Sequence, residues 1–275
     1  MNFPEPFDNL KDLLKEITSV ADYLWQRGWA ERNAGNISVD VTKLIGYKSL
    51  DEKSDTFHRL HASYPALADK TFLVSVSGSR MRDLARDPLQ HMLILRINGT
   101  GDSYRIFSSG NEMQARFVPT SELPTHLGIH QMLATKGRKE SVVLHAHVTE
   151  LIALTQIKEY CDEEKLNHLF WNMHPENGMF IPKGVGFVPY TTPGTKDIAE
   201  KTLAALENHR VALWEKHGAF VISENPGEAF DTIDMLAKAA QIFFFVRNSG
   251  YDPQGLTDEQ LDILKGLAEI PETDD

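Results

Sequence analysis

The stretch Val142-Val-Leu-His-Ala-His-Val-Thr149 carries two histidines, His145 and His147, inside an apolar run. Successive side chains of a strand alternate between its faces, so a strand here projects both imidazoles from one face and packs the intervening apolar residues on the other. Neutral imidazole is a common protein ligand for zinc, and the pair is therefore half of a candidate metal site. The alternative is a half-buried strand on which the histidines only fill space.

A third histidine stands at a break between two apolar segments. His217 lies between strand-like segments within residues 210–223, and it precedes Gly218, which lets backbone or ligand approach closely. We expect it to lean over the same site, although a turn residue alone would explain it. The remaining histidines are read mostly as surface residues or as residues behind the ligands: His58, His61, His91, His126, His130, His168, His174 and His209.

A carboxylate in the segment 118–126 is the next candidate. Thr120 or Ser121 can cap a helix that begins near Glu122, and a polar helix start is a sufficient structural explanation. A carboxylate at such a helix start, if it points at a zinc ion held by three histidines, can also fill the fourth position and leave it to carry a proton.

The rest of the chain alternates helix-like and strand-like patterns. Apolar residues recur at three- and four-residue steps from Leu10 to Leu24, which predicts an amphipathic helix that ends at Gly28. Asn225 is a predicted N-cap, with proline and then glutamate in the first turn, for a long helix through about Asn248.

Short strands and turns fill the segments between these helices. Further predicted strands are 36–41, 72–76, 91–97 and 103–107, further helices are 125–136 and one from Thr149, and 42–66 reads as a polar, irregular insertion. The segments 91–97 and 103–107 form a predicted hairpin. We therefore expect an α/β fold in which helices cover a central mixed, largely antiparallel sheet, as one domain over residues 1–275 with an N-terminal helical segment.

Composition excludes several classes of protein. The net charge of −11 argues against a broad nucleic-acid surface, because phosphate backbones are bound through excess Lys and Arg. The apolar run 242–246 falls far short of the roughly 18 residues that cross a membrane. The single Cys161 excludes an internal disulfide and a thiolate zinc site. No leader-like segment opens the sequence, so a cytoplasmic location is expected.

Several motifs together resemble the class II sugar-phosphate aldolase family. They are Glu31-Arg-Asn-Ala-Gly-Asn-Ile-Ser38, Ser77-Gly-Ser79, Pro119-Thr-Ser-Glu-Leu-Pro124, His145-Ala-His147 and Trp214-Glu-Lys-His-Gly218. The chain length, the insertion and the segments 169–176 and 181–184 are most similar to a longer branch of this family. The shorter fuculose-phosphate aldolases and the pentulose-phosphate epimerases fit the length less well. The resemblance implies a three-layer fold.

The resemblance also implies roles for particular residues. His145, His147 and His217 would bind one zinc ion per chain, and Glu122 would handle the proton on the dihydroxyacetone-phosphate carbon. Glu176 would reach the site from a neighbouring subunit of a fourfold (C4) tetramer and assist at the aldehyde half. The substrate would be a phosphorylated ketose, cleaved next to its ketone, where the metal stabilises the enediolate as it forms.

A phosphate pocket is the last implication of the resemblance. Its residues would be Asn33, Gly35, Asn36, Ser77, Gly78, Thr120 and Ser121. Hydroxyls, amides and exposed backbone N–H groups bind phosphate well, which reconciles an acidic protein with an anionic substrate. Two positions depart from the family pattern, since Ala34 and Val76 stand where glycine is usual or frequent. An epimerase that uses the same retro-aldol chemistry, and an adducin-like scaffold without enzymatic activity, remain the alternatives.

Overall fold

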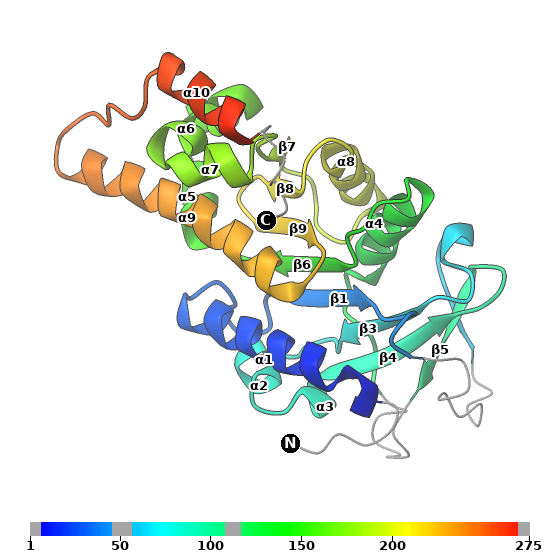
Figure 1. Cartoon of the computed structure of the whole chain (residues 1–275). Coiled ribbons are helices and arrows are strands. Elements are labelled where there is room, and N and C mark those ends of the chain that lie inside the picture. The colour runs from blue at the N-terminus through cyan, green and yellow to red at the C-terminus, as the bar shows by residue number, and fades with distance from the viewer. Residues whose placement is uncertain (1–6, 46–56, 108–116, 269–275) are drawn as a thin grey trace, which may run out of the picture.

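The computed structural model describes residues 7–45, 57–107 and 117–268. Its strands are β1 (Asn36–Asp40), β2 (His58–Arg59), β3 (Thr71–Ser75), β4 (Met92–Ile97), β5 (Ser103–Phe107), β6 (Val142–Ala146), β7 (Gly186–Val188), β8 (Val211–Trp214) and β9 (Gly218–Ser223). Within the described ranges they form one nine-stranded sheet in the order β2-β5-β4-β3-β1-β6-β9-β8-β7 (Figure 1). All neighbours in it are antiparallel except the edge pair β7 and β8. The predicted mixed, largely antiparallel sheet is confirmed.

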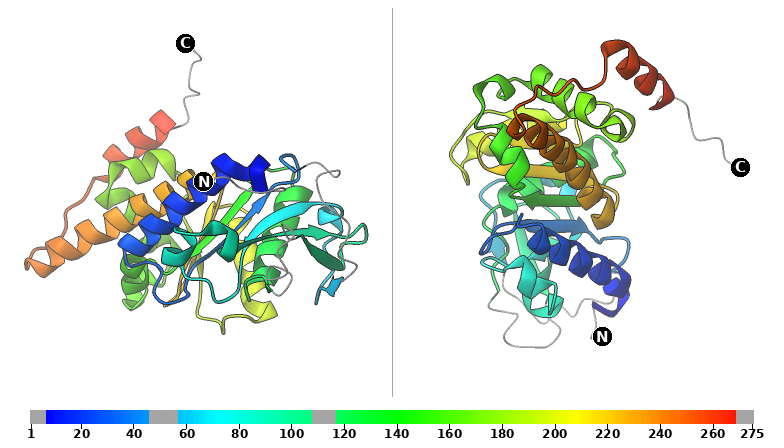
Figure 2. Two further views of the ribbon diagram at one scale, coloured as in Figure 1. Left: turned by 90° about the horizontal axis from the view of Figure 1, so that it is seen from below. Right: turned by 90° about the vertical axis from the view of Figure 1, so that its left-hand side faces the viewer.

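Helices lie on both faces of this sheet (Figures 1 and 2). They are α1 (Lys11–Gln26), α2 (Met81–Leu84), α3 (Pro88–His91), α4 (Leu123–Thr135), α5 (Thr149–Leu154), α6 (Glu163–Met173), α7 (Pro175–Phe180), α8 (Lys196–Leu206), α9 (Pro226–Asn248) and α10 (Asp258–Ala268), with 3-10 turns η1 (Phe7–Leu10), η3 (Pro65–Leu67) and η5 (Lys158–Tyr160). One core cluster contains apolar side chains of the sheet and of α1, α5, α6 and α9. Two further clusters contain apolar side chains of α4, and one of these also contains those of α8. The result is three layers.

The central strand β6 shows how the sequence pattern produces these layers. Leu144 and Ala146 belong to the core cluster under α1 and α9, whereas Val143 packs with the cluster under α4 and α8. The alternation predicted for this stretch is therefore observed, and it leaves His145 on the same face as Val143. His145 stacks on Phe220 of β9 with ring centroids 4.3 Å apart. The imidazole is consequently fixed within a packed layer.

The two long helices agree closely with their sequence patterns. In α1 the buried positions recur at the predicted steps from Leu14 to Leu24. In α9 the side chain of Asn225 accepts a hydrogen bond from the Glu228 N–H at 2.9 Å, which is the N-cap interaction that the sequence predicted. Helix α9 packs against α1 and against β6 and β9, the strands next to the three histidines.

The segment 42–66 is more regular than predicted. Residues 46–56 lie outside the described ranges, but β2 (His58–Arg59) pairs antiparallel with β5 and forms the edge of the sheet. Tyr64 then donates a backbone hydrogen bond to Gly101 O over 2.7 Å. The strand was missed because a two-residue edge strand is too short to show a period in the sequence.

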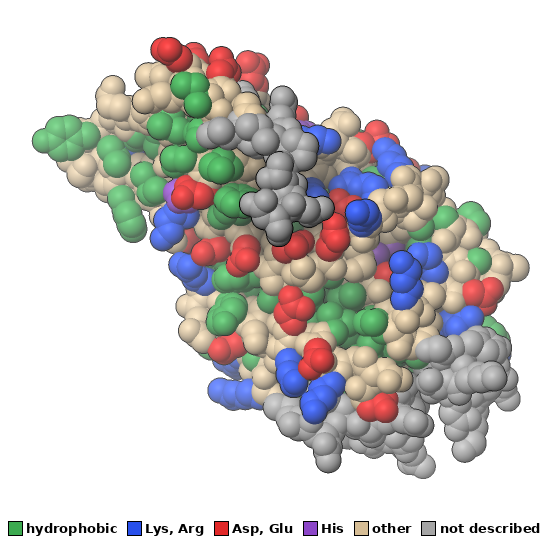
Figure 3. All heavy atoms as spheres, viewed as in Figure 1, with side chains coloured by type: hydrophobic (Ala, Val, Ile, Leu, Met, Phe, Trp, Pro, Cys, Tyr) green, Lys and Arg blue, Asp and Glu red, His purple; other side chains and the backbone are tan. Residues whose placement is uncertain are grey.

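The surface carries both charged and apolar areas. Figure 3 shows hydrophobic side chains gathered at the end of the molecule that is formed by α6, α7, α9 and α10. Phe180 and Ile263 are 64% and 61% exposed there. Across the residues that the structure describes, no helix combines the length and apolarity needed to span a membrane.

Candidate active site

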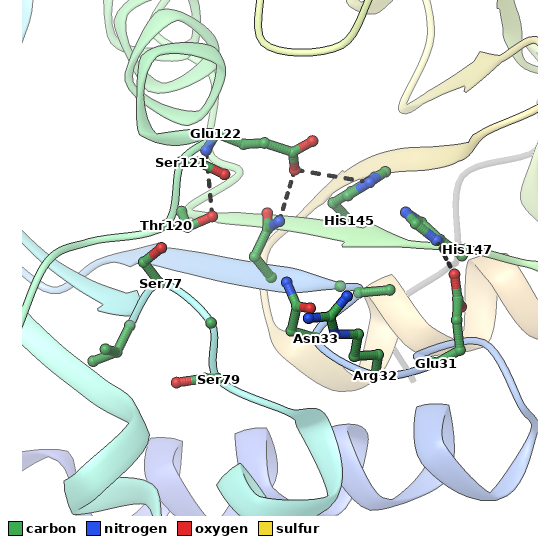
Figure 4. A pocket seen from close by; sticks show the side chains of 15 residues that line it. Glu31, Arg32, Asn33, Ser77, Ser79, Thr120, Ser121, Glu122, His145 and His147 are labelled. Atoms are coloured by element: carbon green, nitrogen blue, oxygen red, sulfur yellow. Dashed lines mark hydrogen bonds and ion pairs between the residues drawn. The ribbon is translucent and has the colours of Figure 1, made fainter.

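A cavity opens where central strands of the sheet end (Figure 4). Asn36 at the start of β1 pairs with His145 of β6, and Ala146 pairs with Ala219 of β9, so these ends lie side by side. The cavity has a volume of about 340 Å³, which is in the range of small-molecule sites. Its lining is Glu31, Arg32, Asn33, Ala34, Gly35, Asn36, Val76, Ser77, Gly78, Ser79, Thr120, Ser121, Glu122, His145 and His147.

The three candidate histidines meet beside this cavity. His145, His147 and His217 each present a ring nitrogen, and these atoms lie within 4.8 Å of one another. The rings come from β6, from the segment just after it, and from the turn between β8 and β9. The structure therefore brings together the set that the sequence singled out, and such a set suits a divalent metal ion.

The protonation of these rings fits a metal site. The Nδ1 of His145 lies 3.0 Å from Ala219 O, so Nδ1–H donates to that carbonyl and the Nε2 lone pair is free. This Nε2 is buried without a hydrogen-bond partner. Burial, and then the neighbouring His147 and His217, hold the pKa of His145 well below its usual value, and burial also lowers the pKa of His217. Neutral imidazole is the form that binds metal.

A carboxylate orients the second ligand. His147 Nδ1–H donates to Glu31 Oε1 over 2.7 Å, which directs the other ring nitrogen of His147 toward His145 and His217. The backbone N–H of His147 donates to Trp29 O over 3.0 Å and holds the same loop against the strand end. Glu31 belongs to a motif of the sequence, but no role could be predicted for it because 116 residues separate it from its partner.

A strained turn places the third ligand. Lys216, just before His217, has a φ of 60°, a left-handed conformation that is uncommon for a non-glycine residue. Its N–H donates to Thr155 Oγ1 over 2.8 Å and stabilises the turn. A Cβ at Gly218 would overlap Ala146 O, so glycine allows the two backbones to approach closely. That approach brings His217 beside the histidines of β6.

Glu122 points into the cavity from the start of α4 (Figure 4). Its Oε2 accepts a hydrogen bond from Asn36 Nδ2 over 2.6 Å and lies 3.7 Å from His145 Nε2. The Glu122 N–H donates to Thr120 Oγ1 over 3.3 Å. The predicted cap at Thr120 or Ser121 is wrong, because Glu122 itself occupies the N-cap position of α4 and no side chain makes a capping hydrogen bond there. The Glu122 carboxylate faces the triad instead.

Two further histidines lie behind this carboxylate, deeper in the core. His126 and His130 on α4 are 0% and 3% exposed. Their rings contact Asn36 and Ser38 of β1. Neither is a surface residue, and burial between α4 and the sheet was not visible in a single helical segment. No sequence signal separates them from solvent-exposed histidines.

Loops from two sides supply the candidate phosphate contacts. Gly35 and Gly78 have φ values of 82° and 75°, conformations that glycine adopts without strain. A Cβ at Gly35 would lie 3.3 Å from His145 O, so the loop packs closely on the strand end. Ala34 and Val76, the two departures from the family pattern, fit without a left-handed backbone. Val76 forms a β-bridge with Pro119, which holds the two loops together.

Arg32 is a cavity residue that the sequence analysis left without a role. It lines the cavity beside Asn33. Its φ of 50° is left-handed, and such backbones concentrate at functional sites. An exposed guanidinium at the cavity would attract an anionic ligand. Only its place in the motif 31–38 could have drawn attention to it.

Glu176 lies elsewhere on this chain. Its side chain is 51% exposed, is 3.1 Å from His174 Nδ1, and is not among the residues that line the cavity. Glu176 follows Pro175, which starts the short helix α7, although the turn-rich composition of residues 172–178 is typical of a loop. Proline is compatible with the first helical position, and a junction between two helices is rich in the same residues as a loop.

Comparisons with known proteins agree with this geometry. Residues 15–244 match the family model described as Class II Aldolase and Adducin N-terminal domain. A rhamnulose-1-phosphate aldolase from Bacteroides thetaiotaomicron is 35% identical over 269 residues, which cover 96% of this chain and 98% of that protein. One from Pectobacterium carotovorum is 34% identical over 252 residues, 89% of each chain.

A solved structure extends the likeness to the fold. The crystal structure of a sugar-phosphate aldolase from Thermotoga maritima superimposes with a TM-score of 0.73 at 31% identity, and the match covers 90% of this chain and 99% of that one. Fold and site together define an α/β protein with a cluster of three histidines, able to hold a divalent metal ion, where central strands of its sheet end. The chain belongs to the class II aldolase and adducin family, and within it to the class II aldolases.

Proposed function

We propose that the protein is a zinc-dependent sugar-phosphate aldolase that reversibly cleaves L-rhamnulose 1-phosphate to dihydroxyacetone phosphate and L-lactaldehyde. The observation that carries the proposal is the convergence of three imidazoles and the Glu122 carboxylate at a cavity with polar loops. The two relatives named as rhamnulose-1-phosphate aldolases, matched over most of the chain, support the choice of sugar.

The chemistry divides between the metal and the chain's own groups. Zinc bound by His145, His147 and His217 would supply Lewis acidity toward the ketone and the neighbouring hydroxyl of the sugar. As the C3–C4 bond breaks, the hydroxyl on carbon 4 gives its proton to Glu176 of a neighbouring subunit, the carboxylate that we assign to the aldehyde half, and the electron pair stays with the dihydroxyacetone-phosphate half. Glu122 delivers a proton to C3 of that half, and removes it in the aldol direction. The hydrogen bond from Asn36 holds Glu122 for this transfer.

We propose that the phosphate binds between the two loops that line the cavity. Ser77, Thr120 and Ser121 offer hydroxyls and Gly78 and Ser121 offer backbone N–H groups on one side, and the loop of Asn33 and its neighbours faces them across the cavity (Figure 4). Of the residues assigned to phosphate by resemblance, Asn36 differs. Its carbonyl oxygen and one amide hydrogen are already used by His126 and Glu122.

Glu176 is proposed to act from a neighbouring subunit of a C4 tetramer. A cyclic assembly closes when each subunit offers one surface to the next, so a residue far from its own site can complete another. Glu176 is on α7, the short helix that also carries the exposed side chains of Met179 and Phe180. Such a patch supports burial against a partner. We also propose that residues 1–275 form one domain with an insertion around 42–66.

The proposal is tested by measuring products from a panel of substrates. Purified protein with zinc is incubated with L-rhamnulose 1-phosphate, L-fuculose 1-phosphate or L-ribulose 5-phosphate, and released dihydroxyacetone phosphate is measured with a coupled dehydrogenase. We expect release to be fastest from L-rhamnulose 1-phosphate. Faster release from the fuculose ester would contradict the assigned sugar. Conversion of the pentulose ester without triose release would indicate an epimerase, and inactivity toward the whole panel would favour a scaffold.

A further inference from the structure

A chain of hydrogen-bonded side chains runs from Glu122 into the core. Asn36 Nδ2 donates to Glu122 Oε2 over 2.6 Å, and Asn36 Oδ1 contacts His126 Nε2. His126 Nδ1 lies 2.7 Å from Ser38 Oγ, and Ser38 Oγ lies 2.8 Å from His130 Nε2. Each of the four residues behind Glu122 is buried. The carboxylate therefore rests on a polar network that extends from β1 to α4.

The acceptor at the end of this chain fixes the direction of every bond in it. Asn36 donates its NH₂ to Glu122 and therefore turns its oxygen, which can only accept, toward His126. His126 then needs Nε2–H, which leaves Nδ1 to accept from the Ser38 hydroxyl. Ser38 in turn accepts from Nε2–H of His130. All donors point toward Glu122. If one hydrogen bond were reversed, two acceptors or two donors would face each other at the next bond.

Both rings are neutral, which makes this direction obligatory. Burial lowers the pKa of His126 to about 3 and that of His130 to about 4. A neutral imidazole has one donor and one acceptor nitrogen, so it can act as a directional link. A buried donor or acceptor that loses its partner costs roughly 1–3 kcal/mol. The network therefore favours one orientation of the Asn36 amide.

The chain is suited to orientation and not to proton transport. A proton that passed through Asn36 would have to convert its amide to the imidic acid, because the amide has no titrating group in the physiological range. The hydrogen-bonded network also stays within the core, and side chains alone link Glu122 to His130. What it can control is the rotamer of Asn36 and hence the position of the carboxylate.

We propose that His126 is a positioning residue that acts through Asn36 on Glu122, with Ser38 and His130 fixing its tautomer. This inference rests on the proposed function of Glu122. Productive proton transfer needs the carboxylate oxygen at one place relative to the substrate carbon, and a small displacement lowers the rate steeply. His126 itself is not among the residues that line the cavity.

The packing around His126 dictates the test variants. Its ring meets Phe220 edge to face with centroids 5.6 Å apart, and Phe220 stacks on His145. His126→Phe keeps a ring in this place and removes both nitrogens. His126→Gln loses the ring but returns an N–H donor toward Asn36. The pair therefore separates loss of the hydrogen bond from loss of packing.

Kinetics and metal content of both variants test the proposal. We expect His126→Phe to keep its zinc content and KM while kcat falls roughly 10- to 100-fold, the usual effect of removing a partner behind a functional group. His126→Gln should recover most of the lost kcat despite its poorer packing. A parent-like kcat in His126→Phe, or equal losses in the two variants, would overturn the proposal. If His126→Phe does not fold, Ser38→Ala removes one oxygen from the chain, and a parent-like kcat there would count equally against it.

A second measurement does not depend on activity. Nitrogen NMR of the imidazoles should show His126 as the neutral Nε2–H tautomer, with an N–H signal that shifts when Asn36 is replaced by serine. An Nδ1–H tautomer or a charged ring at neutral pH would refute the chain. If the parent protein cleaves no ketose phosphate, the proposed function fails, while the tautomer still decides whether the positioning geometry exists.

Discussion

Replacement of Glu122 by glutamine is the most informative single substitution. The parent carboxylate holds Oε2 toward Asn36 at 2.6 Å, so Oε1 is the oxygen left for the substrate proton. In Glu122→Gln the amide oxygen can keep the bond to Asn36, and the NH₂ then replaces Oε1. A donor stands where a base is needed, with almost no change in shape.

The size of the expected effect follows from this substitution. Loss of a positioned acid–base group costs roughly 10²- to 10⁴-fold in rate, which corresponds to about 2.7–5.5 kcal/mol in the activation barrier. Because the three imidazoles are untouched, metal content should equal that of the parent. The loss should therefore appear in kcat and hardly in KM.

Two assays follow the reaction on either side of carbon–carbon cleavage. One measures dihydroxyacetone phosphate released from L-rhamnulose 1-phosphate, and the other measures deuterium entering dihydroxyacetone phosphate from heavy water. Both rates should fall together in Glu122→Gln. The control is Glu200→Gln, the same change at an exposed residue that pairs with Lys196 on α8, which should behave like the parent. Parent-like exchange in Glu122→Gln would refute the assigned role.

Three other perturbations test the surroundings of the site. Glu31→Ala removes the acceptor that orients one histidine and should weaken zinc affinity roughly 10- to 100-fold in a chelator competition assay; unchanged affinity would mean that the bond is incidental. Glu176→Ala and His145→Ala, each nearly inactive alone, should regain aldol cleavage when refolded into mixed rings verified by mass spectrometry. Mixed rings no more active than their parents would remove Glu176 from the site. Gly218→Ala places a Cβ against Ala146 O and should lower the free energy of unfolding in urea by roughly 1–3 kcal/mol; equal stability would contradict the close approach.

Local patterns predicted the elements that carry the ligands. The alternation around His145 gave a strand because both of its faces are packed, and periodic apolar residues gave α1 because one face of that helix meets the sheet. The N-cap at Asn225 was predicted correctly because capping depends on a few adjacent residues. Features of this kind are encoded within one segment.

Features that depend on distant segments could not be derived in the same way. His126 and Asn36 are 90 residues apart, and their contact follows from how α4 packs on β1. The short strand β7 (Gly186–Val188) becomes a strand only by pairing with β8. The hydrogen bond between His147 and Glu31 could be found only from the three-dimensional structure. The family motifs anticipated most of the cavity lining, because short motifs preserve a geometry that single-sequence periodicity does not contain.

Metal-dependent cleavage is the most direct test of the central claim, that three histidines and a divalent metal drive aldol cleavage. Purified protein is stripped with a chelator and titrated with zinc while dihydroxyacetone phosphate release from L-rhamnulose 1-phosphate is recorded, in parallel with His217→Ala. We expect activity to vanish on stripping, to return in proportion to zinc and to saturate near one ion per chain, whereas His217→Ala should regain little. Full activity in the stripped protein, or equal zinc-dependent recovery by His217→Ala, would contradict it.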